Sequence, residues 1–327
     1  MTTKEKLAIL LEEKDGAFLS GNAIAESLGI TRAAVWKNIK QLEQEGYQIE
    51  AVTNRGYRLL PMNDAISESA VRSFLGDKND LFTLDVRDSV TSTNSLLKEM
   101  APELPDWYVM IARNQTAGRG RVGRSFFSPY DTGIYLSVLL KPDISVSDAG
   151  KLTTASAVAA CRAIESSTEV KAQIKWVNDV FVNGGKVCGI LTEASVNFET
   201  GKPDWIVTGI GFNVYPPKGG FPKELQKVAG VITEKAEKNL RAKLAAEYIR
   251  NFYEICGRLS ETQFYQEYKE RCFILGQLIN VIKGEETIPA RALDILEDFS
   301  LLVQYQDGRE EALAAGEVSI RPGSSET

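Results

Sequence analysis

The chain has 327 residues, of which 43% are hydrophobic and 25% charged, and its formal net charge is −6. This length is typical of two or three domains, and the composition is typical of a globular protein. No apolar run approaches the roughly 20 residues that span a bilayer, and the first ten residues carry charges instead of the apolar core of a signal peptide. We therefore expect a cytoplasmic protein that has no membrane partner.

The chain contains no histidine, and its four cysteines are far apart in the sequence. This composition excludes Ser–His and Cys–His nucleophile pairs and histidine-ligated metals. Without a C-x-x-C pair, the cysteines are expected to be small buried hydrophobic residues. Any chemistry must therefore use lysine, arginine, carboxylates, amides and backbone N–H groups.

Residues 1–60 have the pattern of a winged helix-turn-helix. Thr2 and Glu5 predict a capping box at the start of the first helix. A short helix, a turn at Gly29 and a second helix that begins after Thr31 then follow. We expect helices between residues 2 and 16 and over 22–28 and 32–45, followed by a hairpin, the wing, over 47–60.

The helix over 32–45 has two distinct faces. Val35, Ile39 and Leu42 recur at helical spacing and should face the core. The opposite face is basic and carries Trp36, which suits a recognition helix in a DNA major groove. A solvated face with Trp36 packed on a partner is the alternative. The predicted DNA-binding residues are Arg32, Trp36, Lys37, Lys40 and, at the tip of the wing, Arg55.

The segment 61–64 is predicted to be a linker, and a mixed sheet covered by helices is expected after it. A polar stretch, 88–94, opens a helix that runs to residue 100. A long helix over 239–259 carries a stripe of apolar side chains. Predicted strands cover residues 82–86, 107–112, 133–140, 170–176, 180–182, 188–194 and 205–210, with a further helix over 148–165.

The most informative stretch is the loop Gly118-Arg119-Gly120-Arg121-Val122-Gly123-Arg124. Glycine lets a ligand approach the backbone closely, and arginine matches carboxylate and phosphate oxygens. The composition therefore favours binding of an anion, although a flexible basic loop and a contact with single-stranded RNA are alternatives.

Two further clusters are individually weak. The first runs from Lys175 through the turn Asn178-Asp179 to Lys186 and Gly189, and the second is Gly209-Ile210-Gly211-Phe212-Asn213. Lone lysines are usually solvated, and an isolated Asn-Asp pair is more often a turn former.

Taken together, these segments resemble the bifunctional biotin protein ligases, also called biotin operon repressors. The motifs are G-R-G-R-x-G-R at 118–124, K-W-x-N-D at 175–179, K-x-x-G-I-L-x-E at 186–193, G-I-G-x-N at 209–213 and S-T-N at 92–94. The resemblance covers nearly the whole chain. One departure is Val177, where many members of the family have proline.

The resemblance implies a two-step reaction that needs biotin, ATP and Mg²⁺. The biotin carboxylate attacks the α-phosphorus of ATP, and a lysine of a biotin carboxyl carrier protein then attacks the resulting biotinoyl-5′-AMP. It also implies a biotin-responsive repressor of biotin synthesis and transport genes. In that role a homodimer would form through the central sheet and bind double-stranded operator DNA.

By motif, the family implies three groups of site residues. Arg119, Lys186 and Asp179 are the expected catalytic residues, and Asp179 is the candidate protein ligand for Mg²⁺. The expected biotin-binding residues are Ser92, Thr93, Asn94, Gln115, Gly118, Arg119, Gly120, Arg121, Lys186 and Gly189. The expected nucleotide-binding residues are Arg121, Arg124, Phe126, Trp176, Asn178 and Asn213, with packing as the alternative role of Trp176.

The last segment, 271–327, reads as short strands that predict a small SH3-like barrel, ahead of a disordered tail from residue 323. The predicted fold is therefore α+β in three domains: a winged helix-turn-helix (1–62), a class II synthetase-like ligase domain (63–270) and the barrel (271–322). Two other functions stay open, a lipoate or octanoate ligase and a ligand-responsive transcription factor without enzymatic activity.

Overall fold

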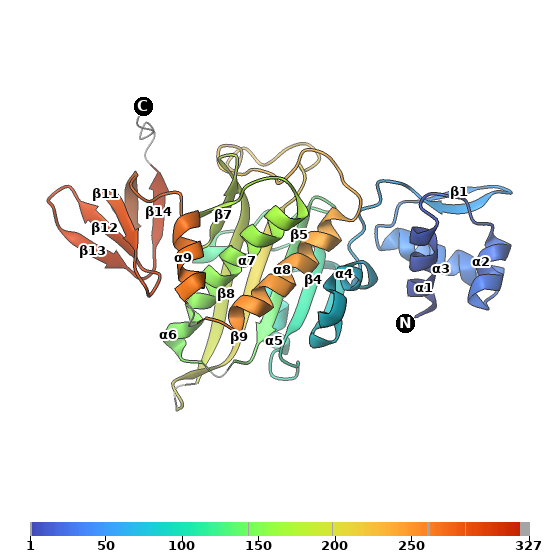
Figure 1. The fold of residues 1–327 in the computed structure, drawn as a ribbon, viewed down its shortest axis with the longest axis horizontal. Coiled ribbons are helices and arrows are strands. Elements are labelled where there is room, and N and C mark those ends of the chain that lie inside the picture. Colours follow the sequence, from blue (N-terminus) through green and yellow to red (C-terminus); the bar gives the residue numbers. More distant parts are fainter. Residues whose placement is uncertain (1, 143, 198, 260–261, 285, 321–327) are drawn as a thin grey trace.

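The computed structural model describes residues 2–142, 144–197, 199–259, 262–284 and 286–320. Figure 1 shows three parts in a row, with the winged helix at one end, a layered domain in the middle and a small sheet at the other end. This arrangement confirms the predicted fold class. The predicted tail from residue 323 lies outside the described residues.

The N-terminal part contains α1 (Thr3–Glu13), α2 (Gly21–Leu28), α3 (Arg32–Gln44) and the hairpin of β1 (Ile49–Val52) and β2 (Gly56–Leu59). The predicted capping box at Thr2 and Glu5 is present, and the Thr31 hydroxyl caps α3. Val35, Ile39 and Leu42 are buried, as their spacing predicts.

The central part is a seven-stranded mixed sheet in the order β3-β4-β5-β9-β8-β7-β6, in which only β3 and β4 are parallel. The strands are β3 (Thr83–Val90), β4 (Tyr108–Gln115), β5 (Gly133–Leu140), β6 (Gln173–Lys175), β7 (Asp179–Val182), β8 (Gly185–Asn197) and β9 (Lys202–Asn213). The helices are α4 (Glu68–Leu75), α5 (Thr93–Met100), α6 (Val146–Ala149), α7 (Lys151–Ser167), α8 (Leu240–Cys256) and α9 (Thr262–Arg271), with short 3-10 turns at Gly76–Leu81 and Arg121–Gly123.

The two faces of this sheet are covered differently, because side chains alternate along each strand. Val109 of β4 belongs to the large core that includes side chains of α7 and α8, whereas its neighbour Met110 packs with Leu97 of α5. Figure 1 shows α7 and α8 lying across one face. The other face carries α5, which leaves part of the sheet available for a site.

The C-terminal part is a five-stranded antiparallel sheet in the order β13-β12-β11-β10-β14. Its strands are β10 (Leu278–Lys283), β11 (Glu286–Ile295), β12 (Leu301–Tyr305), β13 (Glu310–Leu313) and β14 (Glu317–Ile320). Neither β13 nor α9 was predicted from the sequence. The sequence of α9 is mostly polar, and its signal is limited to Phe264 and Tyr268, which are both buried at helical spacing.

The segment 61–64 is not a solvated linker. Asp64 is only 7% exposed, and its Oδ2 accepts a hydrogen bond from Nε of Arg241 in α8 at 2.8 Å. Tyr215 donates to the same oxygen at 2.8 Å. A buried charge is tolerated because it is paired and hydrogen-bonded, so this segment connects the N-terminal part firmly to α8 and to Tyr215 of the central part.

A second polar contact joins the two parts through Arg113 of β4, which is 7% exposed. Its Nη1 donates to the Gln44 carbonyl at the end of α3 at 2.6 Å and to Asp88 at 2.9 Å, while its Nη2 donates to Asp131 at 2.9 Å. The large apolar clusters of the two parts are separate. Charge and hydrogen bonding therefore contribute strongly to the position of the winged helix.

Replacing Arg241 should destabilise the central domain. In Arg241→Met the carboxylate of Asp64 stays buried without its cation, which costs about 3–5 kcal/mol in comparable buried pairs. Urea unfolding followed by tryptophan fluorescence should show a lower midpoint. The control is Lys238→Met, which removes the exposed ion pair with Asp15 and a longer-range attraction to Glu12 and should leave the midpoint nearly unchanged. Equal midpoints for Arg241→Met and wild type would contradict the assignment.

Candidate functional site

The floor of the site is the middle of the sheet, on the face that α5 covers. Pairing of β5, β9 and β8 places Tyr135, Gly211 and Gly189 in one row. The next row on the same face is Ser137, Gly209 and Leu191. Three glycines in adjacent positions leave a strip of the sheet without side chains.

Side chains from two other segments fill part of this strip. A Cβ atom at Gly209 would lie 1.9 Å from Oδ1 of Asn94, and one at Gly211 would lie 2.3 Å from the Phe126 ring. Asn94 belongs to the first turn of α5, and Phe126 follows the glycine-arginine loop. The glycines are therefore required for these two side chains to approach the sheet.

One end of the site is a cluster of buried polar side chains. Oε1 of Gln115 accepts from the backbone N–H of Thr93 at 2.9 Å, which joins β4 to the start of α5. Oγ of Ser137 lies 2.7 Å from Oγ1 of Thr93 and 2.6 Å from Oδ1 of Asn94. These groups are neutral, and they suit a ligand that offers both hydrogen-bond donors and acceptors.

Glu193 of β8 ends this cluster. Its Oε2 accepts from Nδ2 of Asn94 at 3.0 Å, and its Oε1 lies 2.6 Å from Nζ of Lys98. Burial raises the pKa of the Glu193 carboxyl, but hydrogen bonds from Lys98 and Asn94 and nearby positive charges outweigh burial and lower the pKa. Glu193 is therefore an anion at neutral pH.

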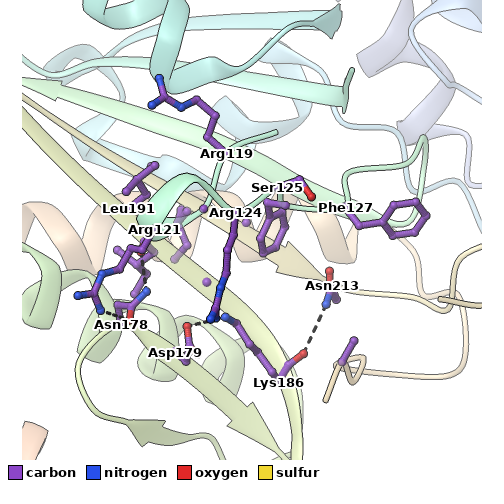
Figure 2. A pocket seen from close by; sticks show the side chains of 18 of the residues that line it. Arg119, Arg121, Arg124, Ser125, Phe127, Asn178, Asp179, Lys186, Leu191 and Asn213 are labelled. Atoms are coloured by element: carbon purple, nitrogen blue, oxygen red, sulfur yellow. Dashed lines mark hydrogen bonds and ion pairs between the residues drawn. The ribbon is translucent and has the colours of Figure 1, made fainter. Parts of the chain in front are cut away.

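The glycine-arginine loop, residues 116–132, crosses over the site. The backbone N–H of Gly120 donates to the Arg124 carbonyl at 2.7 Å, so the loop is folded on itself. Arg121 reaches across to Asn178, with Nη1 to Oδ1 at 2.9 Å, and its Nη2 donates to the Gly316 carbonyl at 3.2 Å. In Figure 2, Arg119 points away from Arg121 and Lys186, and its Nη2 lies 3.8 Å from Glu193.

The other end of the site is charged. Nζ of Lys186, at the start of β8, lies 2.6 Å from Oδ1 of Asp179, at the start of β7. Figure 2 shows both side chains beside Arg124 and Asn213. Nδ2 of Asn213 donates to the Lys186 carbonyl at 3.4 Å, so the ends of β9 and β8 are held together beside these charges.

These groups enclose a cavity of about 430 Å³. It is lined by most of the residues that the sequence singled out: Ser92, Thr93, Asn94, Gln115, Arg119, Gly120, Arg121, Arg124, Phe126, Asn178, Asp179, Lys186, Gly189 and Asn213. The structure thus brings together four stretches of the chain, 92–94, 115–126, 178–189 and residue 213. Whether each residue contacts a ligand stays a prediction.

Two expected site residues do not line this cavity. Trp176 is 3% exposed, and its indole Nε1 donates to the Phe299 carbonyl at 2.9 Å, so it packs in the core and the adenine contact is not supported. The carbonyl of Gly118 accepts from the N–H of Phe126 at 2.9 Å, which closes the base of the loop. Gly118 therefore supports the site from outside.

The segment between β9 and α8 was not predicted to belong to the site. This segment has no named helix or strand, and it contributes Phe221, Glu224, Leu225, Val228 and Ala229 to the cavity wall. Loops longer than about 12–15 residues without secondary structure are often functional. Its prolines and glycines at 216–222 were the available signal.

Within the described residues, no three carboxylate or cysteine side chains cluster as a metal site would require. Burial raises the pKa of the Cys188 thiol well above its ordinary value. The cysteines are free, and all but Cys256 are fully buried, which fits their expected packing role.

The expected DNA-binding residues are all exposed. Arg32, Lys37 and Lys40 are exposed along α3, and Trp36 is 57% exposed between them. Nζ of Lys40 lies 2.6 Å from Glu43, and the Arg55 guanidinium lies 4.2 Å from the centre of the Phe18 ring. The wing is thus anchored to the segment before α2.

Comparisons with known proteins agree with these two sites. A model of the biotin/lipoate A/B protein ligase family matches residues 86–213, and an HTH domain model matches residues 3–58. The biotin protein ligase of Aquifex aeolicus, solved in complex with biotin and ATP, superimposes with a TM-score of 0.62 at 27% identity, over 73% of this chain and 98% of that one. The fold and the site therefore define a protein ligase joined to a helix-turn-helix module.

Some relatives match this chain over nearly its whole length, including both the helix-turn-helix part and the ligase part. The bifunctional ligase/repressor BirA of Bacillus spizizenii is 32% identical over 96% of this chain and 98% of its own length. The Escherichia coli protein of the same name is 30% identical over 98% of both chains. This chain belongs to the family of bifunctional ligase/repressors, which confirms the resemblance seen in the sequence.

Adding one methyl group at Gly209 should damage the site. The Cβ of Gly209→Ala would overlap the amide of Asn94, and overpacking of this kind costs about 1–3 kcal/mol. The urea midpoint should fall. Gly257→Ala is the control, because the nearest atom to its Cβ lies 3.6 Å away. If both variants unfold at the wild-type midpoint, the close approach of Asn94 to β9 is wrong.

Proposed function

We propose that the cavity binds biotin and ATP together, forms biotinoyl-5′-AMP and transfers biotin to a lysine of a carrier protein. The observation that carries this proposal is the polarity of the cavity. A neutral hydrogen-bonding cluster around Thr93 lies at one end, and Lys186 with the arginine loop lies at the other. Biotin has the same polarity, with a ureido ring at one end and a carboxylate at the other.

The cationic end would drive the first step by electrostatics and positioning. Two anions must meet when the biotin carboxylate attacks the α-phosphorus and pyrophosphate leaves. Lys186 and the arginines of the loop would hold the reacting oxygens and stabilise the charge that gathers on them. In the second step the amine of the carrier lysine attacks the acyl carbon, and AMP leaves. No histidine is needed for either step.

Mg²⁺ fits this site as a companion of ATP. Magnesium is commonly bound by one or two carboxylates together with substrate phosphates. Asp179 is a carboxylate in the cationic part of the cavity and would hold the ion there. The ion would neutralise charge on the phosphates of ATP, while Lys186 would still bind the carboxylate of biotin.

A lipoate or octanoate ligase is the closest alternative chemistry. The acyl chain of those substrates offers no N–H or carbonyl to the cluster of Thr93, Asn94 and Gln115. An acyl chain would remove water from the free lone pairs of this cluster without offering a hydrogen bond in return, which costs about 1–3 kcal/mol for each polar group left unsatisfied. Competition of lipoate and octanoate with labelled biotin tests this alternative directly.

Removal of the Lys186 charge should stop adenylate formation. Lys186→Met keeps the length of the side chain, and loss of such a group costs about 10²–10³ in rate. The measurement is biotin-dependent exchange of labelled pyrophosphate into ATP. Lys171→Met, an exposed lysine before β6, is the control and should exchange at the wild-type rate. Normal exchange in Lys186→Met would remove Lys186 from the mechanism.

We also propose that the chain represses biotin synthesis and transport genes as a dimer formed through the central sheet. The exposed basic face of α3 and the wing support the contact with DNA. Ordering of the loop over biotinoyl-5′-AMP would have to favour the dimer, since a ligand shifts an equilibrium only when it binds the two states differently.

Lys37→Ala should weaken binding to operator DNA and lower the salt dependence by about one counterion. Gel shifts with biotin and MgATP would measure binding, and light scattering would measure the dimer. Biotin transfer should stay at the wild-type level, because α3 is separate from the cavity. Wild-type operator affinity in Lys37→Ala, with the same salt slope, would exclude this residue from the DNA contact.

A further inference from the structure

The position of Lys186 in β8 does not by itself direct its side chain into the cavity. Side chains alternate between the two faces of a strand. Gly189 is on the cavity face, so regular alternation would place Val187 on that face and Lys186 on the opposite one. Lys186 nevertheless lines the cavity, with its Nζ 2.6 Å from Oδ1 of Asp179. An irregularity in β8 must therefore turn this side chain.

The irregularity is a β-bulge at Val187. Val180 of β7 pairs with Cys188 of β8. The next residue of β7, Phe181, pairs with Lys186, which leaves Val187 as an extra residue. Val187 and Cys188 are consecutive, yet both are fully buried in the large core. A bulge re-aims the side chains beside it, so the extra residue reverses the alternation and turns Lys186 into the cavity.

The backbone beside this bulge is held by the segment between β9 and α8. The pairing of β9 with β8 ends at Cys188, and Ala229 forms a parallel bridge with Lys186 beyond that point. The Lys186 N–H donates to the Val228 carbonyl at 2.7 Å, and the Gly230 N–H donates to the Lys186 carbonyl at 2.8 Å. Residues 228–230 therefore hold both backbone hydrogen-bonding groups of Lys186.

Two glycines let these two stretches of backbone come so close. A Cβ atom at Gly230 would lie 2.8 Å from Cα of Gly185, and one at Gly185 would lie 2.7 Å from Cα of Gly230. Neither glycine has a positive φ, so the close approach, and not the backbone conformation, requires glycine. Backbone atoms cannot turn aside as a flexible side chain can. An added methyl group must therefore push residues 228–230 away from Lys186.

Residues 228–230 are also fixed from the side of β9. The Ile232 N–H donates to the carbonyl of Asn213, the last residue of β9, at 3.0 Å. The segment thus joins the end of β9 to the bulge in β8. Val228 and Ala229 also line the cavity, so a simple role in the cavity wall is the alternative that a test must exclude.

We propose that Gly230 is a positioning residue for Lys186. It allows residues 228–230 to pair with the Lys186 backbone, and this pairing holds the bulge that turns the amine into the cavity. The inference rests on the proposed function and deepens it, because it names the contact on which the orientation of the reacting lysine depends.

The test is a double-mutant cycle on the full chain, measured by biotin-dependent exchange of labelled pyrophosphate into ATP. In Gly230→Ala, kcat should fall between about 10-fold and 100-fold, because displacement of a reacting group by about 1 Å has an effect of this size. In Lys186→Met, whose residual exchange is the second background, Gly230→Ala should cost little more. Residues that act as a unit are strongly non-additive.

Two further variants complete the test. Gly185→Ala disturbs the same contact from the other side and should lose exchange in the same way, and it replaces Gly230→Ala if that variant does not fold. Gly257→Ala is the matched control, because the nearest atom to its Cβ lies 3.6 Å away at the end of α8. It should exchange at the wild-type rate.

Wild-type exchange in both Gly230→Ala and Gly185→Ala would overturn the inference. An equal loss with and without the Lys186 amine would also overturn it, because the glycine would then act independently of Lys186. A higher KM for ATP at unchanged kcat would show a role in the cavity wall alone, with the same consequence. Absence of biotin-dependent exchange in the wild type would instead reject the proposed function.

Discussion

The site depends on one ladder of backbone hydrogen bonds, the antiparallel pairing of β5, β9 and β8. This pairing aligns Gly209, Gly211 and Gly189 on a single face of the sheet. A slip of β9 by one residue would turn Gly209 and Gly211 to the opposite face, away from Gly189 of β8. The polar cluster at α5, the arginine loop and Lys186 are then brought around the same bare strip, although they come from three separate segments of the chain.

Much of the fold and of the candidate site could be predicted from the sequence, because several of the sequence patterns are local. The capping box at Thr2, the turn at Gly29 and the apolar spacing of α3 define the winged helix from nearest neighbours alone. The loop at 118–124 and the pair Lys186 and Asp179 were identified from residue types and from the resemblance to a family, and the structure places them around one cavity.

Other features depend on contacts that no local pattern encodes. Ser137 reads as an ordinary residue in an apolar strand, and only the tertiary fold places it behind Thr93. Trp176 follows a motif lysine, yet it packs against the backbone of Phe299 from the C-terminal part. Asp64 has the sequence context of a linker, and its partner Arg241 lies 177 residues further along the chain.

The contact of Arg113 has a mechanical consequence. The guanidinium of Arg113 donates a hydrogen bond to the Gln44 carbonyl in the last turn of α3. It also donates to Asp131, where the loop over the cavity returns to β5. Arg113 is the buried charge of this contact, and it must either keep its partners or regain water. The contact between the winged helix and the central domain should therefore either hold or break. A movement of the loop at Asp131 would be transmitted to α3 while the contact holds, and it would not be transmitted once the contact breaks.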